Sequence, residues 1–241
     1  MKAEEKEEYN PIGKTIFCAF VLLVVSVIVP SILPFQVFSF WHSQTSFMDW
    51  MRAGIPVFIW GVSLGTFIHI WRTLAGDTEG VEKLSREFSL GQIFVHGVFT
   101  SVRAGLFEEI MFRWIIFLGA IVTGKVMNFL LFGFCSNGLL AWFHLNIAGP
   151  VADVTTFHYL HPYLFHPSGW AVGAAILGTN AFFRDGHRYQ GFIGYVNSWF
   201  VGMFLFHIFF VHGLVAAILI HVIYDLLLDV LLTTRIALYR L

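Results

Sequence analysis

Three charged side chains stand together in residues 106–114, a segment that is otherwise apolar (Glu108, Glu109 and Arg113). Residues four positions apart on a helix lie one above the other, so Glu109 and Arg113 can form an ion pair. Glu108 lies about 100° further round the helix and faces a different partner. A carboxylate without a paired cation is suited to act as a general base. The alternative is that all three side chains only form an ion-paired link between helices.

A histidine and an aspartate nearer the end of the sequence have the same helical spacing. His221 and Asp225 are four residues apart and share one face of a helix. Such a pair can orient an imidazole or supply two metal ligands, and it can also be a buried pair without chemistry. His144 ends a further apolar segment and becomes a candidate only beside the other residues. No His-Glu-x-x-His sequence occurs, which excludes a zincin-type metal site.

Taken in order, these residues resemble a known set of motifs. Glu108-Glu109-x-x-x-Arg113, then His144 after an apolar segment, then His221-x-x-x-Asp225 is similar to the CAAX-protease and bacteriocin-processing enzyme family. Its members are intramembrane endopeptidases, including the Ras-converting type that removes the last three residues of prenylated CAAX proteins. The resemblance covers residues 103–229, which it identifies as a catalytic core.

The resemblance implies a role for each residue. Glu108 would activate the attacking water with the help of His144, and Glu109 with Arg113 would shape the site. His221 and Asp225 would stabilise the oxyanion. Three positions depart from the family pattern: Asp225 stands where asparagine is commoner, Leu140 where an aromatic residue is usual, and Trp114 where glycine often follows the arginine. An ionised aspartate cannot donate a hydrogen bond, so Asp225 would instead orient His221 or bind a metal.

The resemblance leaves two forms of catalysis open. In one form, Glu108, His144 and His221 bind a Zn²⁺ ion, which activates the water. In the other, no cofactor is needed and the glutamate is the base. Either way the expected substrate is a peptide bond of a membrane-associated protein or peptide, of the prenylated CAAX type or another.

The composition indicates how such residues are positioned. Of the 241 residues, 57% are hydrophobic and only 12% are charged, about half the charged fraction of an ordinary soluble domain. The net charge of −1 lacks the basic excess of a nucleic-acid-binding protein, and the low charge excludes a disordered chain. Residues 1–241 are therefore expected to form one integral, multi-pass membrane domain within the lipid bilayer.

Charge-free stretches predict the membrane helices, since a span needs about 20 mostly apolar residues. An all-α bundle of about seven or eight membrane helices is expected. A retained first span at 15–34 follows a net-acidic N-terminal segment, and a turn at His212-Gly213 divides the long apolar run 189–224. The other predicted spans are 53–71, 105–121, 126–145, 168–182, 191–210 and 213–232, with an extra helix at 91–103. Residues 72–90, 146–169 and 184–188 are expected as loops or turns.

Buried charges also suit two functions that involve no hydrolysis. Intramembrane Glu, Asp, Arg and His side chains mark ion and proton pathways as well as active sites. The sequence shows no internal repeat of the kind that many transporters contain. A solute- or ion-translocating protein and a noncatalytic membrane adaptor therefore remain the alternatives to a peptidase.

Overall fold

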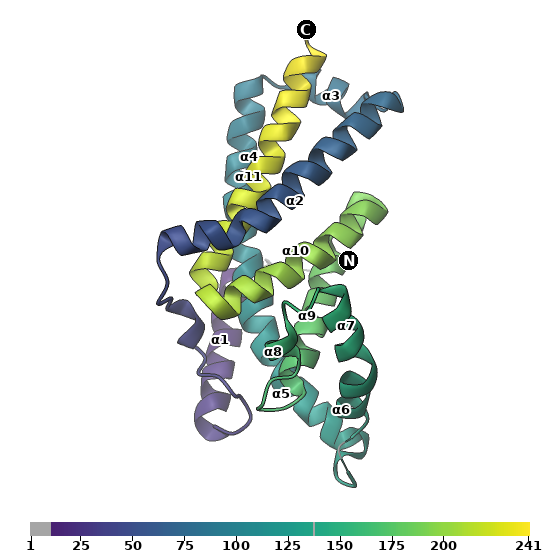
Figure 1. Ribbon diagram of the computed structural model, residues 1–241. Coiled ribbons are helices and arrows are strands. Elements are labelled where there is room, and N and C mark those ends of the chain that lie inside the picture. The colour runs from purple at the N-terminus through teal and green to yellow at the C-terminus, as the bar shows by residue number, and fades with distance from the viewer. Residues whose placement is uncertain (1–10, 137) are drawn as a thin grey trace, which may run out of the picture.

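The computed structural model describes residues 11–136 and 138–241, and every regular element in this part of the chain is a helix (Figure 1). This confirms the expectation of an all-α fold for the described residues. The acidic N-terminal segment predicted before the first span falls mostly in residues 1–10, outside the described residues. The first helix, α1, runs from Pro11 to Ile28 and ends before the predicted limit at residue 34.

Four helical segments are long and apolar enough to cross a membrane, which supports an integral membrane protein. They are Phe47–Leu74 (α2), Leu90–Gly133, Arg188–His212 and Leu214–Tyr239 (α11). This number is smaller than the predicted seven or eight. One reason is that the helices predicted at 91–103 and 105–121 are a single continuous element.

The continuous element Leu90–Gly133 begins as α4, Leu90–Glu108, whose first turn is closed by a capping box between Ser89 and Gln92. It passes without a break through a π-helical stretch, Glu109–Ile116 (η2), into α5, Phe117–Asn128, and ends in η3, Phe129–Gly133. Neither the charge of Arg103 nor Gly105 interrupts it, because helical hydrogen bonding continues through both.

The predicted span 126–145 is broken where this element ends. Phe132 has a φ of 69°, in the left-handed region, and Gly138 a φ of 75°, so the chain reverses between them. Helical structure then resumes over α6 (Leu139–Phe143), η4 (His144–Ala148) and α7 (Gly149–Thr155). The irregular segment expected from 146 to 169 therefore begins only after residue 155.

A second reversal follows α7, at Phe157 and His158, and leads into the short helix α8, His161–Leu164. The chain then forms α9 (Ala171–Gly186), a turn that includes η5 (Arg188–Gln190), and α10 (Gly191–His212). Gly213, with a φ of 89°, makes the predicted turn between α10 and α11.

Helix α11 lies at the centre of the helical packing and contacts α2, α4 and α10 (Figure 1). Helix α2 approaches it through three glycines, Gly54, Gly61 and Gly65, and side chains of α11 lie against each of them. Small residues allow membrane helices to pack closely in this way. The short α3, Glu79–Glu87, also contacts α11, and α9 packs on both α5 and α10.

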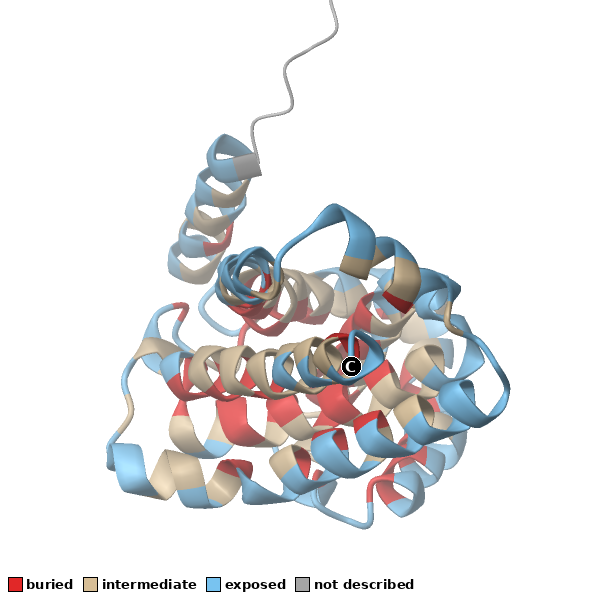
Figure 2. Ribbon diagram, turned by 90° about the horizontal axis from the view of Figure 1, so that it is seen from above, coloured by how far each residue is buried: buried red, intermediate tan, exposed pale blue. Residues whose placement is uncertain are grey.

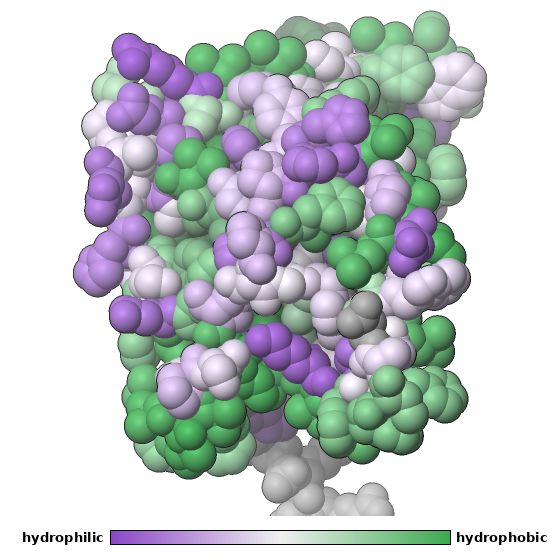
Figure 3. Space-filling model, turned by 60° about the horizontal axis from the view of Figure 1, so that its bottom comes forward, coloured by the Kyte–Doolittle hydropathy of each residue, from purple (hydrophilic) through white to green (hydrophobic). Residues whose placement is uncertain are grey.

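The buried residues concentrate on the faces that these helices turn toward one another (Figure 2). Large apolar side chains also cover much of the outside, among them Ile59, Phe67, Phe99 and Phe192. Figure 3 shows such side chains gathered at the lower edge of one face, with hydrophilic ones along its left edge. An apolar exterior of this extent is typical of a protein that contacts lipid rather than water.

Candidate functional site

The predicted ion pair forms in the interior. Oε1 of Glu109 lies 3.2 Å from Nη1 of Arg113, and both side chains are fully buried. The guanidinium of Arg113 also donates to the carbonyl oxygen of Gly202 on α10 and lies 4.2 Å above the ring of Phe183 on α9. Arg113 thus ties the η2 segment to two other helices. The segment is π-helical, a rare conformation that often occurs at functional sites.

His221 completes this buried group from α11. Its Nδ1 lies 2.8 Å from Oε1 of Glu109, so a hydrogen on Nδ1 is donated to the carboxylate. That contact fixes both the orientation and the tautomer of the ring. The other ring nitrogen, Nε2, therefore faces Glu108, whose Oε2 lies 4.0 Å away, and Asp225, whose Oδ2 lies 3.6 Å away.

Glu108 differs from its neighbour in exposure. Its side chain is 27% exposed, whereas that of Glu109 is fully buried. The Oε2 atom of Glu108 has no direct hydrogen-bond partner among the described residues. Two imidazole nitrogens face this oxygen, Nε2 of His221 at 4.0 Å and Nε2 of His187 at 3.9 Å. These separations are too long for direct hydrogen bonds and are of the size that one bridging water spans.

The reasoning from sequence missed His187, which it placed in a polar turn. The residue follows α9, and its Nδ1 lies 2.7 Å from the carbonyl oxygen of Phe183, to which it donates. Its Nε2 then faces Glu108, as does the Nε2 of His221. The available signal was the position of this histidine directly after an apolar helix.

His144 does not join this cluster. Its Nε2 lies 3.0 Å from the carbonyl oxygen of Leu164, and its ring contacts Gly173 near the start of α9. His221 instead packs against Phe183, near the end of the same helix. Ten residues separate the two contact points, about 15 Å along a helix axis. The structure thus brings together Glu108, Glu109, Arg113, His221 and Asp225, and places His144 elsewhere.

His144 lines a separate cavity of about 610 Å³ between α9 and the α6–α7 segment. The cavity has an apolar lining that includes Phe143, Ile147 and Trp170, and it extends to Arg184. Arg184 lies one helical turn before His187. The cavity therefore follows α9 from His144 toward the end of the helix where His187 faces Glu108.

The predicted zinc ligands do not fit a single ion as they are arranged. Glu108 and His221 lie near each other, but the Nε2 atom of His144 is occupied by a backbone carbonyl at the other end of α9. Among the described residues, only one group of three donors has all its ligand atoms within 4.8 Å of one another: Asp153, His158 and His161. That group lies outside the cluster around Glu108.

A further carboxylate continues the polar face of α11. Asp229 is one turn beyond Asp225, and its Oδ2 accepts a hydrogen bond of 2.7 Å from the hydroxyl of Ser101 on α4. Gly97 and Gly105 flank Ser101 by one turn on either side, and both meet α11 closely. The two helices therefore pack through small residues on α4 against Asp229 and Val222 of α11.

A sequence pattern that resembles a nucleophile motif has a structural role instead. Residues 61–65 read Gly-Val-Ser-Leu-Gly, the Gly-x-Ser-x-Gly pattern of serine hydrolases. That motif requires a sharp turn between a strand and a helix. Here the residues lie inside α2, Ser63 is exposed, and Gly61 and Gly65 contact side chains of α11. The glycines serve helix packing.

Comparison of the chain with protein-family models, with curated proteins and with solved structures found no match.

Proposed function

We propose that this protein is an intramembrane endopeptidase that hydrolyses a peptide bond of a membrane-associated protein or peptide, with Glu108 as the general base. One observation carries the proposal: the partly exposed side chain of Glu108 turns its buried Oε2 atom toward two imidazoles, each held at Nδ1 by another acceptor. Arrangements that fix a base and its neighbours in this way are typical of acid–base catalysis.

The reaction follows from these contacts. A water bound between Glu108 and the Nε2 atoms transfers a proton to the carboxylate, and its oxygen adds to the carbonyl carbon of the substrate. The protonated Glu108 then gives the proton to the leaving amine as the carbon–nitrogen bond breaks. Two products result, a carboxylic acid and an amine, and the base is regenerated.

His221 supplies the electrostatic stabilisation. Its Nδ1 is bound to the buried carboxylate of Glu109, which stabilises the imidazolium form as the aspartate of a serine-protease triad does. The Nε2–H of that form donates to the developing oxyanion. Arg113 contacts the same Glu109 oxygen, and Asp225 limits the rotation of the His221 ring from the other side.

No step is assigned to a metal ion, because Glu108, His144 and His221 do not converge. We assign His144 to the substrate path instead. The apolar cavity along α9 suits an extended hydrophobic segment that enters at His144 and reaches the site near Arg184. Prenylated and unmodified CAAX-type peptides are both candidates for this path.

The number of spans is also a proposal. We infer that α1 and α9, each shorter than a full span, join the four long segments in the membrane, which makes six membrane-embedded segments, fewer than the predicted seven or eight. The 44-residue run Leu90–Gly133 is about 66 Å long at 1.5 Å per residue, more than twice the hydrocarbon thickness. Its α4 end, beside the charged α3, would then project into water (Figure 1).

The peptidase proposal is tested with purified protein in liposomes. Farnesylated and unmodified CAAX-type peptides are added, and the products are identified by mass spectrometry. We expect cleavage by the wild type and a loss of at least about 100-fold in Glu108→Gln. Glu79→Gln, at an exposed position on α3, is the matched control and should cleave normally. Full activity in Glu108→Gln, or none in the wild type, would overturn the proposal.

A second function is favoured by one observation, the row of carboxylates on α11. Asp225 and Asp229 follow His221 at four-residue spacing, and Ser101 faces Asp229 from α4. Such a row is the arrangement expected of a proton path. Proton entry into liposomes with a trapped pH-sensitive dye would support this function if Asp229→Asn abolished it. A protein with neither activity would fit the adaptor.

A further inference from the structure

Three potential metal ligands meet at the end of α7, outside the Glu108 cluster. Oδ2 of Asp153 lies 2.8 Å from Nδ1 of His158 and 3.0 Å from Nδ1 of His161. The carboxylate is nearly enclosed, with 10% of the side chain exposed, whereas the two imidazoles are 67% and 60% exposed. The group therefore has a buried anion at its base and two imidazoles at its rim.

The backbone is shaped to build this group. Phe157 and His158 have φ values of 53° and 62°, in the left-handed region that residues other than glycine rarely adopt. This reversal returns the chain to α7, where the amide of His158 donates to the carbonyl oxygen of Asp153. Strained conformations of this kind are unfavourable and persist where the surroundings impose them.

The hydrogen bonds leave the carboxylate incompletely satisfied. Both imidazoles share Oδ2 of Asp153, while its Oδ1 is buried without a hydrogen-bond partner. A buried polar atom without a partner is costly, so its persistence calls for an explanation.

We propose that Asp153, His158 and His161 bind a divalent transition-metal ion, with Zn²⁺ as the best fit. Two imidazoles and a carboxylate are the ligands that Zn²⁺ takes, and three protein ligands leave a fourth position for water. Ligand atoms about 2.0–2.2 Å from a tetrahedral ion lie about 3.3–3.6 Å apart. The separations observed here, 2.8 and 3.0 Å, are only slightly shorter. Ca²⁺ and Mg²⁺ prefer oxygen ligands and do not suit two imidazoles.

Binding requires only a small change in this group. Each imidazole moves its hydrogen from Nδ1 to Nε2, which is free to face water because both rings are exposed. The metal then replaces two shared hydrogen bonds, and Asp153 can offer its unpartnered Oδ1 as a further ligand. No backbone rearrangement is needed, because the reversal at residues 157 and 158 already sets the three positions.

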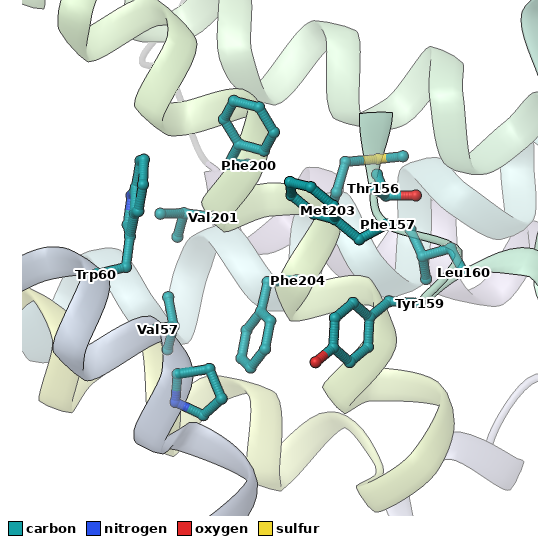
Figure 4. A pocket seen from close by; sticks show the side chains of 11 residues that line it. Val57, Trp60, Thr156, Phe157, Tyr159, Leu160, Phe200, Val201, Met203 and Phe204 are labelled. Carbon is teal, nitrogen blue, oxygen red and sulfur yellow. The ribbon is translucent and has the colours of Figure 1, made fainter. Parts of the chain in front are cut away.

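The metal would fix one wall of an apolar pocket. Residues of the same turn, including Phe157, Tyr159 and Leu160, line a cavity of about 310 Å³ together with α2 and α10 (Figure 4). On the opposite side lie Val57 and Trp60. An ion held by residues on both sides of Phe157 restrains this wall, so the site is structural and separate from the proposed peptidase reaction.

The site is tested with detergent-solubilised protein that carries no polyhistidine tag and has been treated with a chelator. Zn²⁺ binding is measured by calorimetry, and Co²⁺ is used as a probe because its visible absorption reports tetrahedral coordination. We expect one ion per chain, and binding at least about tenfold weaker in His158→Ala and in His161→Ala. His166→Ala, in the same histidine-rich segment but outside the group, is the matched control.

Two controls distinguish a loss of metal binding from a loss of the folded structure. His158 and His161 are exposed, and circular dichroism should show wild-type helix content in both variants. Asp153→Asn preserves the shape of the side chain while removing its charge, and should also weaken binding. Wild-type affinity in all three variants, or the absence of saturable Zn²⁺ binding by the wild type, would overturn the proposal.

Discussion

Glu109 and His221 are 112 positions apart in the sequence, yet Oε1 of one lies 2.8 Å from Nδ1 of the other in the buried interior. The contact joins η2 to α11 and gives the two neighbouring glutamates opposite tasks. Glu109 contacts His221 and Arg113, while Glu108 keeps a partly exposed side chain whose Oε2 has no direct hydrogen-bond partner among the described residues. The structural role of Glu109 and the chemical role of Glu108 thus differ because adjacent residues of a helix point about 100° apart.

The first prediction compares the two glutamates by stability. Glu109→Ala leaves Arg113 buried without its partner and is expected to lower the free energy of unfolding by about 3–5 kcal/mol. Glu108→Ala removes a partly exposed side chain that makes no direct hydrogen bond through Oε2, so its effect should stay below about 1 kcal/mol. Unfolding of both variants in a detergent titration measures the difference. Equal losses would contradict these assignments.

The second prediction concerns His187, whose Nε2 faces Glu108. His187→Ala removes one side of the proposed water site and should lower kcat by about 10²-fold, with a smaller change in KM. The matched control is Arg188→Ala, because the neighbouring side chain is exposed and contacts Asp185 and the ring of Tyr195. A change confined to KM would assign His187 to substrate binding instead.

The sequence predicted contacts that depend on local spacing. Glu109–Arg113 and His221–Asp225 are one helical turn apart, so any helix places each pair on one face, and the structure does so. The sequence alone could not place His187 in the site, because only tertiary packing brings the end of α9 to η2. Tertiary packing also separates His144 from the other predicted site residues, because the helix that carries it packs at the other end of α9.

Part of the fold was also predictable from the sequence. Charge-free segments predicted a membrane protein, and Gly213 predicted the turn between α10 and α11. The continuity of residues 90–133 was missed, because Arg103 suggested a boundary between two helices. Hydrogen bonding, rather than charge, decides where a helix ends, and the non-helical conformations of Leu131 and Phe132 interrupt this one.

The third prediction tests the close approach of α4 and α11. A Cβ atom added at Gly105 would lie 2.6 Å from a methyl carbon of Val222 and 3.1 Å from its backbone nitrogen. Gly105→Ala should therefore cost about 1–3 kcal/mol, because the backbone cannot move aside. At Gly119, also helical, the space within 4 Å is open. Gly119→Ala should instead stabilise by about 0.5–1 kcal/mol, as measured in the same titration.

The fourth prediction concerns the metal site and is measured by thermal unfolding. An ion that binds only the folded state at 100 times its dissociation constant adds about 2.7 kcal/mol to the free energy of unfolding. Zn²⁺ should therefore raise the melting temperature of the wild type, and EDTA should reverse the shift. The shift should be absent in Asp153→Asn, because Asp153 is one of the three proposed ligands. It should be preserved in His166→Ala, because His166 is outside this group. Because Asp153, His158 and His161 lie outside the Glu108 cluster, Glu108→Gln should also keep the full shift. A shift lost in Glu108→Gln but kept in Asp153→Asn would move the ion to the proposed active site.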